Sequence, residues 1–334
     1  MLVRTRTYEK SDMARTPSLL SELRAAEKKY GEFESLELLI PDLSGILRGK
    51  RIRRKDFEKC AQEGFVFCAG ATLLNSLGEV TPGVPGCDDG DPDLPARLIP
   101  GSIVPVPWSN KPMAQAFFRI IDENGGDYFG DPRTVLENAL KPLLKRGVTP
   151  VAATELEFYL LDARQGDIRI GAPQVPGTDR PQPGTQVYLP DDLFEVEGFL
   201  DDVYDWCEQQ GIPAEAAISE YSAGMPCCSH QSYTSSRLAC DHAVMLKRVI
   251  KAAARKHGFI ACFMAKPFEE DAGNGLHVHM SLVDKEGENY FSQGKEKMAL
   301  PPFSARLRHA VGGLLKLMPE STALFCPNAN SYRR

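Results

Sequence analysis

The chain has 334 residues, of which 43% are hydrophobic and 25% are charged, and its formal net charge is −6. This balance is typical of a globular protein with room for two domains. It argues against nucleic acid or an anionic membrane as the main partner, and no apolar run is long enough to span a membrane. Nine cysteines without a Cys-x-x-Cys pair fit neither a disulfide framework nor a zinc ribbon, so we expect a cytoplasmic protein with reduced thiols.

The first predicted elements are a helix and a β-hairpin. Apolar residues recur on one face of the segment 16–30, and Ser18 is suited to cap its first turn. A strand over residues 36–42 and a return strand over residues 46–52 are predicted to flank the turn Asp42-Leu43-Ser44-Gly45, which is the pattern of a hairpin. We therefore expect a small N-terminal domain over residues 16–110, after a flexible start at 1–15.

A loop and a linker close this first domain. The segment 81–100 is rich in proline, glycine and aspartate, so we expect an irregular, exposed loop that contributes nothing to a core. Ser109-Asn110-Lys111-Pro112 has the composition of a linker. The second domain is therefore predicted to cover residues 111–334.

Helices and strands alternate along the second domain. A strand is predicted over residues 116–122, and Asp131-Pro132 has the residues that begin a helix. Two further helices are predicted to end at Gly211 and Gly258, the second followed by a strand over residues 259–264. This alternation, with strands of antiparallel character, predicts an α+β enzyme domain.

Two pairs of potential ligands share the same spacing. Glu155 and Glu157 alternate with apolar residues, and so do His277 and His279; residues two apart on a strand point from the same face. Either pair alone is more typical of a solvated sheet face. Two such strands that face one cavity would instead hold divalent cations able to neutralise a polyphosphate and its transferred phosphoryl group.

Common phosphate-binding and hydrolase motifs are missing from the sequence. The run Gly45-Ile46-Leu47-Arg48-Gly49-Lys50-Arg51 lacks the spacing and the Ser or Thr of a phosphate loop. There is neither a Gly-x-Ser-x-Gly motif nor a dinucleotide fingerprint. If the protein uses ATP, metal ions and arginines must therefore hold the phosphates.

Six motifs follow one another along nearly the whole chain. They are Pro41-Asp42-Leu43-Ser44-Gly45-Ile46-Leu47-Arg48-Gly49-Lys50-Arg51, Glu155-Leu156-Glu157-Phe158, Glu220 before Gly224, Lys266-Pro267-Phe268, Gly275-Leu276-His277-Val278-His279 and Asn330-Ser331-Tyr332-Arg333-Arg334. In this order the motifs resemble the glutamine synthetase family. The resemblance implies a small N-terminal β-grasp domain, a catalytic domain of antiparallel strands and helices, and rings of subunits with active sites between neighbours.

The resemblance also implies an ATP-dependent ligase. ATP would phosphorylate the γ-carboxylate of glutamate, and ammonia or an amine would then displace phosphate to form an amide. The matching positions assign Glu157 and Glu220 to one Mg²⁺ or Mn²⁺ ion, and Glu155 and His277 to another. The remaining matches are His279 at the phosphates, Gly273 beside the glutamate substrate, and Arg334 facing substrate or phosphate.

The sequence departs from the family pattern after Gly224. Family members carry a glutamine, an aromatic residue and a metal-binding glutamate there, whereas this chain has Met225-Pro226-Cys227. A thiolate at Cys227 would favour Zn²⁺ over Mg²⁺, although Cys227 and Cys228 as ordinary small residues is the simpler interpretation. The segment 225–237 lacks the pattern of a strand, and we hypothesise a pair of compensating frameshifts in the gene.

The chain ends at Arg334, where family members continue. The continuation would carry another metal-binding glutamate, the glutamate that deprotonates ammonium, and several phosphate-binding arginines. A catalytic domain incomplete in this way is expected to turn over slowly, and to be poorly soluble or heterogeneous in assembly. The alternative to an active ligase is therefore an impaired or inactive remnant that keeps the fold.

The amine acceptor is a further open choice. Phe67-Cys68-Ala69-Gly70 lies where ammonia-using members carry an aspartate. An uncharged pocket suits an alkylamine better than NH₄⁺, which favours the γ-glutamylpolyamine synthetase branch, with glutamate and a polyamine as substrates, over glutamine synthetase itself. A zinc hydrolase built on His277 and His279 is a third interpretation, but it needs a third close ligand, for which no spacing is recognisable.

Overall fold

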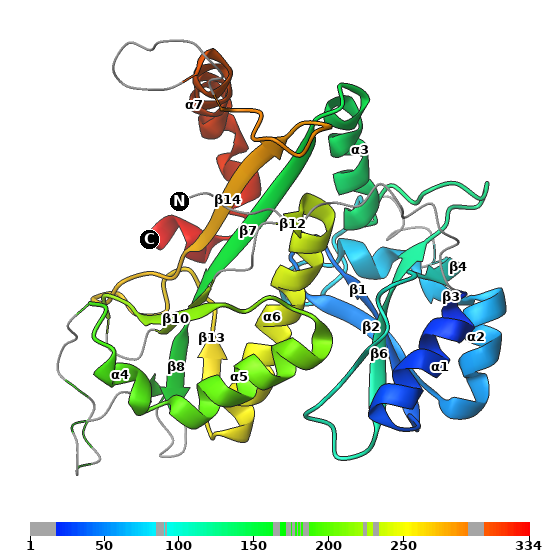
Figure 1. Ribbon diagram of the computed structural model, residues 1–334, viewed down its shortest axis with the longest axis horizontal. Helices are drawn as coiled ribbons and strands as arrows, with labels where there is room; N and C mark the ends of the chain where they lie inside the picture. Colours follow the sequence, from blue (N-terminus) through cyan, green and yellow to red (C-terminus); the bar gives the residue numbers. More distant parts are fainter. Residues whose placement is uncertain are drawn as a thin grey trace. The chain divides into compact units, whose positions relative to one another are not determined.

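The computed structural model describes residues 18–84, 90, 92–162, 168–171, 175, 178, 180, 182, 187–222, 234–292 and 304–334, and the backbone of 226–229. The chain divides into two compact units, Met1–Lys141 and Pro142–Arg334 (Figure 1). Both units combine helices with sheets, so the α+β class is confirmed. In the described part of the chain, no helix has the length and apolar character needed to cross a membrane.

The first unit is built on a six-stranded sheet of order β2-β1-β6-β4-β3, with β5 also paired to β6. β1 and β6 run parallel, and the other neighbours run antiparallel. A β-grasp topology for this unit stays a prediction. The strands are β1 (Ser35–Pro41), β2 (Leu47–Arg53), β3 (Phe65–Cys68), β4 (Asp93–Leu98), β5 (Val104–Pro105) and β6 (Met113–Ile120).

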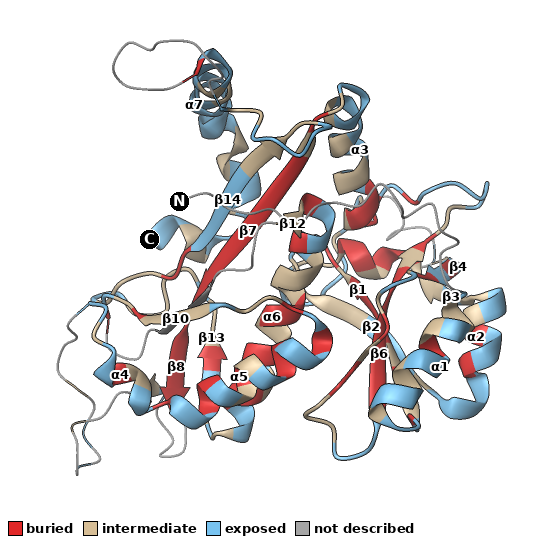
Figure 2. Cartoon of the chain, viewed as in Figure 1, coloured by how far each residue is buried: buried red, intermediate tan, exposed pale blue. Residues whose placement is uncertain are grey.

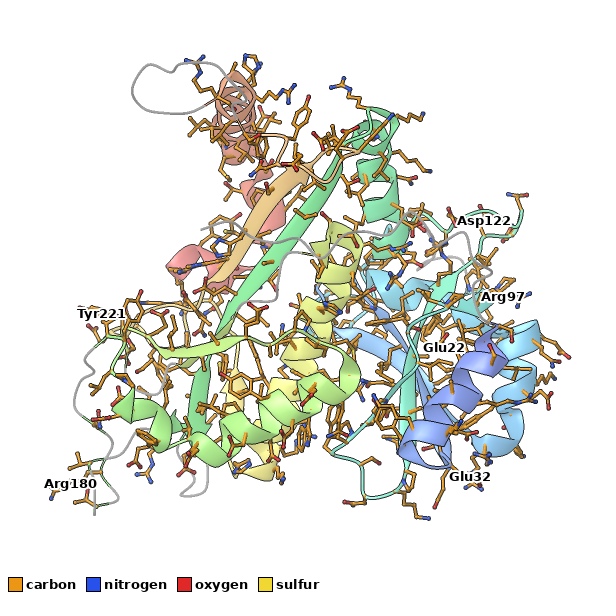
Figure 3. All side chains as sticks on the ribbon, viewed as in Figure 1. Glu22, Glu32, Arg97, Asp122, Arg180 and Tyr221 are labelled. Carbon is orange, nitrogen blue, oxygen red and sulfur yellow. The ribbon has the colours of Figure 1, made fainter. Side chains whose placement is uncertain are left out.

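One face of this sheet packs against two helices, α1 (Leu19–Tyr30) and α2 (Phe57–Glu63). Ser18 caps α1 as predicted, because its Oγ accepts a hydrogen bond from the Ser21 N–H at 3.2 Å. Glu22, labelled in Figure 3, ties α1 to the chain after β4 by accepting hydrogen bonds from the N–H groups of Gly101 (2.8 Å) and Ile103 (2.7 Å). Two short 3₁₀ helices, η1 (Arg54–Asp56) and η2 (Ala69–Leu73), join the strands and helices.

The predicted hairpin is confirmed, and Asp42 organises its turn. Oδ1 of Asp42 accepts hydrogen bonds from the N–H groups of Ser44 (2.9 Å) and Ile46 (2.8 Å), while Oδ2 accepts one from Nε of Arg48 at 2.9 Å. The carboxylate is buried. A side chain that accepts from its own turn and pairs with the returning strand fixes the register of β1 against β2.

Two expectations about this part of the chain need correction. The segment 81–100 is not wholly a loop, because β4 (Asp93–Leu98) pairs with β3 and β6 and buries Leu94, Ala96 and Leu98; residues 85–89 and 91 lie outside the described residues. β6 (Met113–Ile120), which was expected in the second domain, lies in the sheet of the first unit. In both cases, pairing with strands distant in sequence determines the structure, and local composition does not predict it.

The second unit contains two antiparallel sheets. The larger has the order β10-β11-β7-β12, with β14 on the other edge of β7, and the smaller has the order β13-β8-β9. Figure 1 shows β14 running alongside β7 over most of its length. The strands are β7 (Thr149–Glu157), β8 (Tyr159–Asp162), β9 (Arg169–Ile170), β10 (Ala216–Ser219), β11 (Pro226–Ser229), β12 (Thr234–Ser235), β13 (Ile260–Cys262) and β14 (Leu276–Val283).

The helices predicted after residue 130 are present, and α3 (Pro132–Lys145) runs from the end of the first unit into the second. This helix follows Asp131, whose Oδ1 accepts a hydrogen bond from the Arg133 N–H at 2.8 Å. α5 (Glu197–Gln210) ends at Gly211, which takes the left-handed conformation at φ +69°. α6 (Ser236–Lys256) packs against α5 and β7 through a buried apolar stripe. The remaining helices are α4 (Asp191–Phe194), α7 (Ala305–Phe325) and the 3₁₀ helix η3 (Ala329–Arg333).

The segment 225–237 departs from its prediction. Its backbone forms β11 (Pro226–Ser229), which is hydrogen-bonded to β10 on one side and to β7 on the other, and also the short strand β12. Neighbours on both edges impose a strand where the local pattern does not predict one. Residues 223–225 and 230–233, and the side chains of β11, lie outside the described residues.

Burial differs between the elements of the larger sheet. β7 is buried along almost its whole length, whereas β14 and α7 are largely exposed (Figure 2). On β14 the apolar side chains of Leu276, Val278 and Met280 are all more than half exposed. They alternate with His277 and His279, so the two faces of β14 differ in chemistry.

Candidate active site

The two predicted ligand pairs lie on adjacent strands. Glu155 and Glu157 belong to β7, and His277 and His279 belong to β14. In the antiparallel register His277 lies opposite Glu155, and His279 lies opposite Ala153. Directly opposed residues share a face of the sheet, and so do residues two apart on one strand. All four side chains therefore project from the same face.

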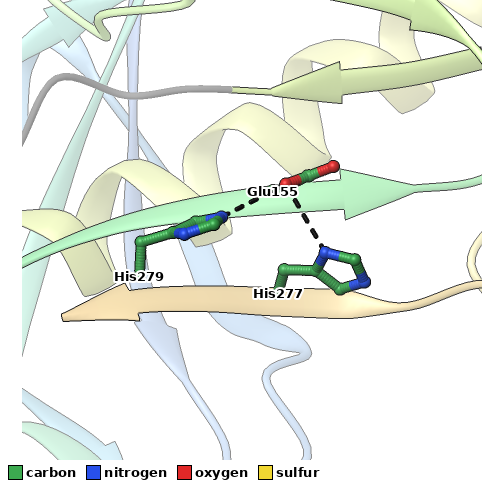
Figure 4. Close-up of side chains that lie close together, drawn as sticks. All are labelled: Glu155, His277 and His279. Atoms are coloured by element: carbon green, nitrogen blue, oxygen red, sulfur yellow. Dashed lines mark hydrogen bonds and ion pairs between the residues drawn. The ribbon is translucent and has the colours of Figure 1, made fainter. Parts of the chain in front are cut away.

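The side chains lie within ion-pair distance of one another, and His279 and Glu155 are hydrogen-bonded. Oε2 of Glu155 lies 3.5 Å from Nδ1 of His277 and 3.2 Å from Nε2 of His279, as Figure 4 shows. Nε2 of His277 also lies 3.3 Å from Oε1 of Glu157. Both glutamates are buried, whereas the two imidazoles are close to half exposed. The carboxylates thus form the floor of the cluster, and the imidazoles border solvent.

Glu220 joins the cluster from the end of β10. Glu155, Glu157 and Glu220 each place one carboxylate oxygen within 4.8 Å of the others. Burial, followed by the negative charges of Glu157 and Glu155, raises the pKa of the Glu220 carboxyl, and His277 opposes this shift. Three carboxylates this close favour any arrangement that brings positive charge among them.

Arg334 and two glycines complete the arrangement. Nη2 of Arg334 lies 3.8 Å from Oε2 of Glu157. A Cβ atom at Gly273 would lie 2.5 Å from the carbonyl oxygen of Ala265 and 2.8 Å from Cγ of Arg334, and one at Gly275 would lie 2.9 Å from Nε2 of His277. The glycines therefore let the Arg334 side chain and the imidazole approach the backbone before β14.

Two asparagines with no role predicted from the sequence hold this backbone in place. Nδ2 of Asn274 donates to the carbonyl oxygens of Cys262 (3.1 Å) and Met264 (2.7 Å). Asn330 forms two hydrogen bonds with the backbone of Lys266, at 2.9 and 2.8 Å, which anchors η3 beside the Lys266-Pro267-Phe268 turn. The position of Asn274 between two glycines was the available signal for its structural role.

The predicted metal, phosphate and glutamate residues all lie in the second unit, and contacts link them. The convergence expected of the four metal-ligand positions is present in the geometry; their roles stay predictions. Cys227 lies opposite Glu157 in the register of β11 and β7, and its side chain is outside the described residues. Phe67-Cys68-Ala69-Gly70 belongs to the first unit, where Phe67 packs edge-on against Phe118, and its predicted role in amine selection also stays a prediction.

The donor set of the cluster suits a divalent cation. Buried carboxylates are costly without compensating charge, and carboxylate oxygens with one imidazole are ligands that Mg²⁺ or Mn²⁺ accepts. Glu155, Glu157 and Glu220 supply the oxygens, and His277 supplies the nitrogen. The residues therefore fit the ions that the sequence resemblance implies.

Comparison with known proteins agrees with this chemistry. Residues 129–334 match the model of the glutamine synthetase catalytic domain. The chain is 35% identical to gamma-glutamylputrescine synthetase PuuA of Escherichia coli (strain K12), over 98% of this chain and 68% of that protein. It is 31% identical to a glutamate–isopropylamine ligase of a Pseudomonas species, over 90% of this chain and 65% of that protein. The solved structure of a GmaS/ADP complex superposes with a TM-score of 0.76 at 24% identity, over 93% of this chain and 66% of that one.

The α+β fold places acidic and imidazole ligands on neighbouring antiparallel strands. The match to the glutamine synthetase catalytic domain and to ligases makes the chain an enzyme of the ligase type by family resemblance. The chain belongs to the glutamine synthetase family. Members of this family generally use ATP and divalent metal ions. The chain spans about two thirds of the length of the relatives that it matches.

Proposed function

We propose that this protein is an ATP-dependent ligase that joins the γ-carboxylate of glutamate to an amine through γ-glutamyl phosphate. The single observation that carries the proposal is the meeting of Glu155, Glu157, Glu220 and His277 on one side of the β7–β14 pair. The named activities of the similar proteins, a gamma-glutamylputrescine synthetase and a glutamate–isopropylamine ligase, support an amine acceptor.

The proposed roles of the residues are those that the family resemblance implies. Glu157 and Glu220 would hold one divalent cation, and Glu155 with His277 would hold another. Bound there, the cations would supply the charge neutralisation that phosphoryl transfer requires. His279, at the solvent side of the cluster, would contact the phosphates, and Arg334 would orient the acyl phosphate or the substrate carboxylate. Gly273 would leave room for glutamate beside the backbone.

We propose a polyamine or another alkylamine as the acceptor in preference to ammonia. The uncharged run Phe67-Cys68-Ala69-Gly70 replaces the aspartate that an ammonium ion would need. The similarity to a gamma-glutamylputrescine synthetase supports the same preference. For a chain extending over the full length of these relatives, the proposal includes self-association into rings.

The proposal can be tested with the purified chain, ATP, Mg²⁺ or Mn²⁺, and glutamate labelled with ¹⁸O in its γ-carboxylate. Putrescine, isopropylamine and ammonium are supplied in parallel, and ADP and the amide are quantified by mass spectrometry. Transfer of one ¹⁸O to the released phosphate, dependent on the amine, is the expected result, because the bridging oxygen of the acyl phosphate comes from the carboxylate and leaves with phosphate when the amine attacks the carbonyl carbon. Amide formation without ¹⁸O in phosphate would contradict the γ-glutamyl phosphate route.

Matched variants connect the activity to the cluster. Glu157→Gln should lower turnover by about 10²–10³-fold, the range seen when one group that stabilises the charge of a transition state is removed. Asp201→Asn, on the exposed side of α5, should leave it unchanged. If the wild-type chain binds Mn²⁺ at the cluster and forms no ADP with any acceptor, the alternative of an inactive protein that keeps the fold is correct.

A further inference from the structure

The segment that leads into β14 is held at two points by residues from the junction of β7 and β8. Glu157 ends β7, and Tyr159 begins β8 two positions later. Glu157 is hydrogen-bonded to Gly275, and Oη of Tyr159 donates a hydrogen bond to the carbonyl oxygen of Ala272 at 2.7 Å. Gly273, the proposed contact for glutamate, lies between these two points.

Ser222 is bonded to the other backbone group of Ala272. Its Oγ accepts a hydrogen bond from the Ala272 N–H at 2.8 Å. Burial raises the pKa of Tyr159, and hydrogen bonding to Ser222 opposes this shift, so the two hydroxyls are also neighbours. The N–H and the carbonyl oxygen of Ala272 are thus both bonded to side chains, one from β8 and one from the chain that follows Glu220.

The side chains that hold the segment are buried, whereas the segment itself borders solvent. Tyr159 is fully buried and Ser222 is buried, while residues 271–273 are partly exposed. Glycine at two of its positions would otherwise allow this segment many backbone conformations. A movement of Ala272 would leave buried hydroxyls without their partners, which is costly. The hydrogen bonds therefore favour a single conformation of the segment.

We infer that Tyr159 and Ser222 are positioning residues for the glutamate substrate, because they fix the backbone of Ala272 and with it the surface that Gly273 offers to the ligand. This role rests on the proposed function, which makes Gly273 the contact for glutamate. Both hydroxyls act through the backbone. A segment that is already ordered loses less conformational freedom when a ligand binds, so loss of either hydroxyl weakens glutamate binding.

Four variants separate positioning from stability. Tyr159→Phe removes one hydroxyl and keeps the buried ring, Ser222→Ala removes the other, and the double variant tests whether both act through Ala272. Ser236→Ala is the matched control. The hydroxyl of Ser236 is also buried and also bonds to the backbone, donating to the carbonyl oxygen of Pro150 at 3.0 Å. This contact lies near the opposite end of β7 from Glu157.

Two measurements on the full chain need no turnover. Hydrogen exchange followed by mass spectrometry reports the order of residues 271–275. Equilibrium dialysis with radiolabelled glutamate, in the presence of Mg²⁺, reports affinity. In a chain that forms amide, the KM for glutamate and kcat are determined as well. Urea unfolding of each variant measures its stability.

Both single variants should exchange faster over residues 271–275 and bind glutamate about five- to tenfold more weakly, the effect of one net hydrogen bond. The double variant should lose less than the product of the two single effects, because each loss already releases Ala272. KM for glutamate should rise with affinity lost, and kcat should stay nearly unchanged. Ser236→Ala should lose stability as Ser222→Ala does and keep the glutamate affinity of the wild type.

Equal glutamate affinity in the wild type, Tyr159→Phe and Ser222→Ala would overturn the inference and leave the proposed ligase intact. A loss of affinity in Ser236→Ala as large as in Ser222→Ala would overturn it too, because stability would then be the cause. A wild-type chain that binds no glutamate would contradict the proposed function, and the substrate role of the two hydroxyls with it, whatever the exchange over residues 271–275.

Discussion

Glu157 and Gly275 are joined by two hydrogen bonds in opposite directions. The backbone N–H of Glu157 donates to the carbonyl oxygen of Gly275 at 3.1 Å, and the backbone N–H of Gly275 donates to Oε2 of Glu157 at 2.5 Å. One carboxylate oxygen of Glu157 is therefore engaged by the chain that leads into β14. The other oxygen, Oε1, faces His277. The orientation of the Glu157 carboxylate is therefore fixed before any ligand binds.

Neutralising one carboxylate of the cluster should stabilise the metal-free protein. In Glu220→Gln the repulsion of Glu220 by Glu157 and Glu155, which helps to raise the Glu220 pKa, is removed. We expect the melting temperature in chelator to rise by roughly 2–4 °C, the effect of about 1 kcal/mol in a unit of this size. Added Mn²⁺ should stabilise the wild type more than the variant. A lower melting temperature of the variant in chelator would show that contacts made by the Glu220 carboxylate stabilise the fold more than its repulsion destabilises it.

Two glycines near Arg334 should respond differently to substitution by alanine. In Gly273→Ala the new methyl group meets the backbone oxygen of Ala265, which cannot move without the chain, so we expect a loss of about 1–3 kcal/mol in urea unfolding. In Gly275→Ala it meets the ends of the His277 and Arg334 side chains, which can rotate away. This variant should lose little stability and bind Co²⁺ more weakly, because the imidazole is displaced. Equal losses of stability would contradict the distinction.

The turn of the first hairpin should depend on Asp42. Asp42→Ala leaves two backbone N–H groups and the Arg48 guanidinium without their buried acceptor, and we expect it to lower the free energy of unfolding by about 2–4 kcal/mol. Arg51→Ala breaks the more exposed ion pair with Glu37 and should cost less than about 1 kcal/mol. Chemical denaturation of both variants, followed by far-ultraviolet circular dichroism, tests the difference.

Asp202 should make stability depend on pH. Its carboxylate accepts a hydrogen bond from Nζ of Lys256 at 2.8 Å and lies 2.6 Å from Nε2 of His257. Burial acts to raise the pKa of Asp202, but these two hydrogen bonds outweigh it and the pKa is lowered. A lowered carboxyl pKa stabilises the fold above the unfolded value, about 3.9, and the contribution is lost as the pH falls through the folded value.

Asp202→Asn should therefore cost about 1 kcal/mol at neutral pH, with the difference from the wild type shrinking as the carboxylate of the wild type is protonated. Urea unfolding across the acidic range measures this. Asp201→Asn, one residue earlier and exposed, is the matched control. A difference between Asp202→Asn and the wild type that stays constant with pH would exclude the proposed pairing as its cause.

Local patterns predicted the parts of the fold that local interactions determine. The Ser18 cap, the Asp42 turn and the glycine after α5 each depend on residues within a few positions of one another. The two ligand pairs were also recognisable from the sequence. Alternation along a strand puts Glu155 and Glu157 on one face of their strand, and it does the same for His277 and His279.

The features that were missed depend on partners far away in the sequence. β4 and β11 have weak strand patterns, and they form because β6 and β7 provide hydrogen-bonding edges. The contact of His279 with Glu155 follows from the register of β14 on β7, which no local pattern specifies. The expected poor solubility of the chain stays a prediction.

During synthesis of the chain, β7 is made well before β14, the strand that pairs with one of its edges. Gly275, the hydrogen-bond partner of Glu157, lies 118 residues further along the chain. At a synthesis rate of about 5–20 residues per second, this separation corresponds to a delay of roughly 6–24 s. During that time the edge of β7 that later receives β14 has no partner from its own chain. Glu155 and Glu157 place two negative charges beside this edge, and like charges discourage pairing with the same strand of another nascent chain. The carboxylates proposed to hold cations in the finished protein would thus already act against aggregation before the site exists.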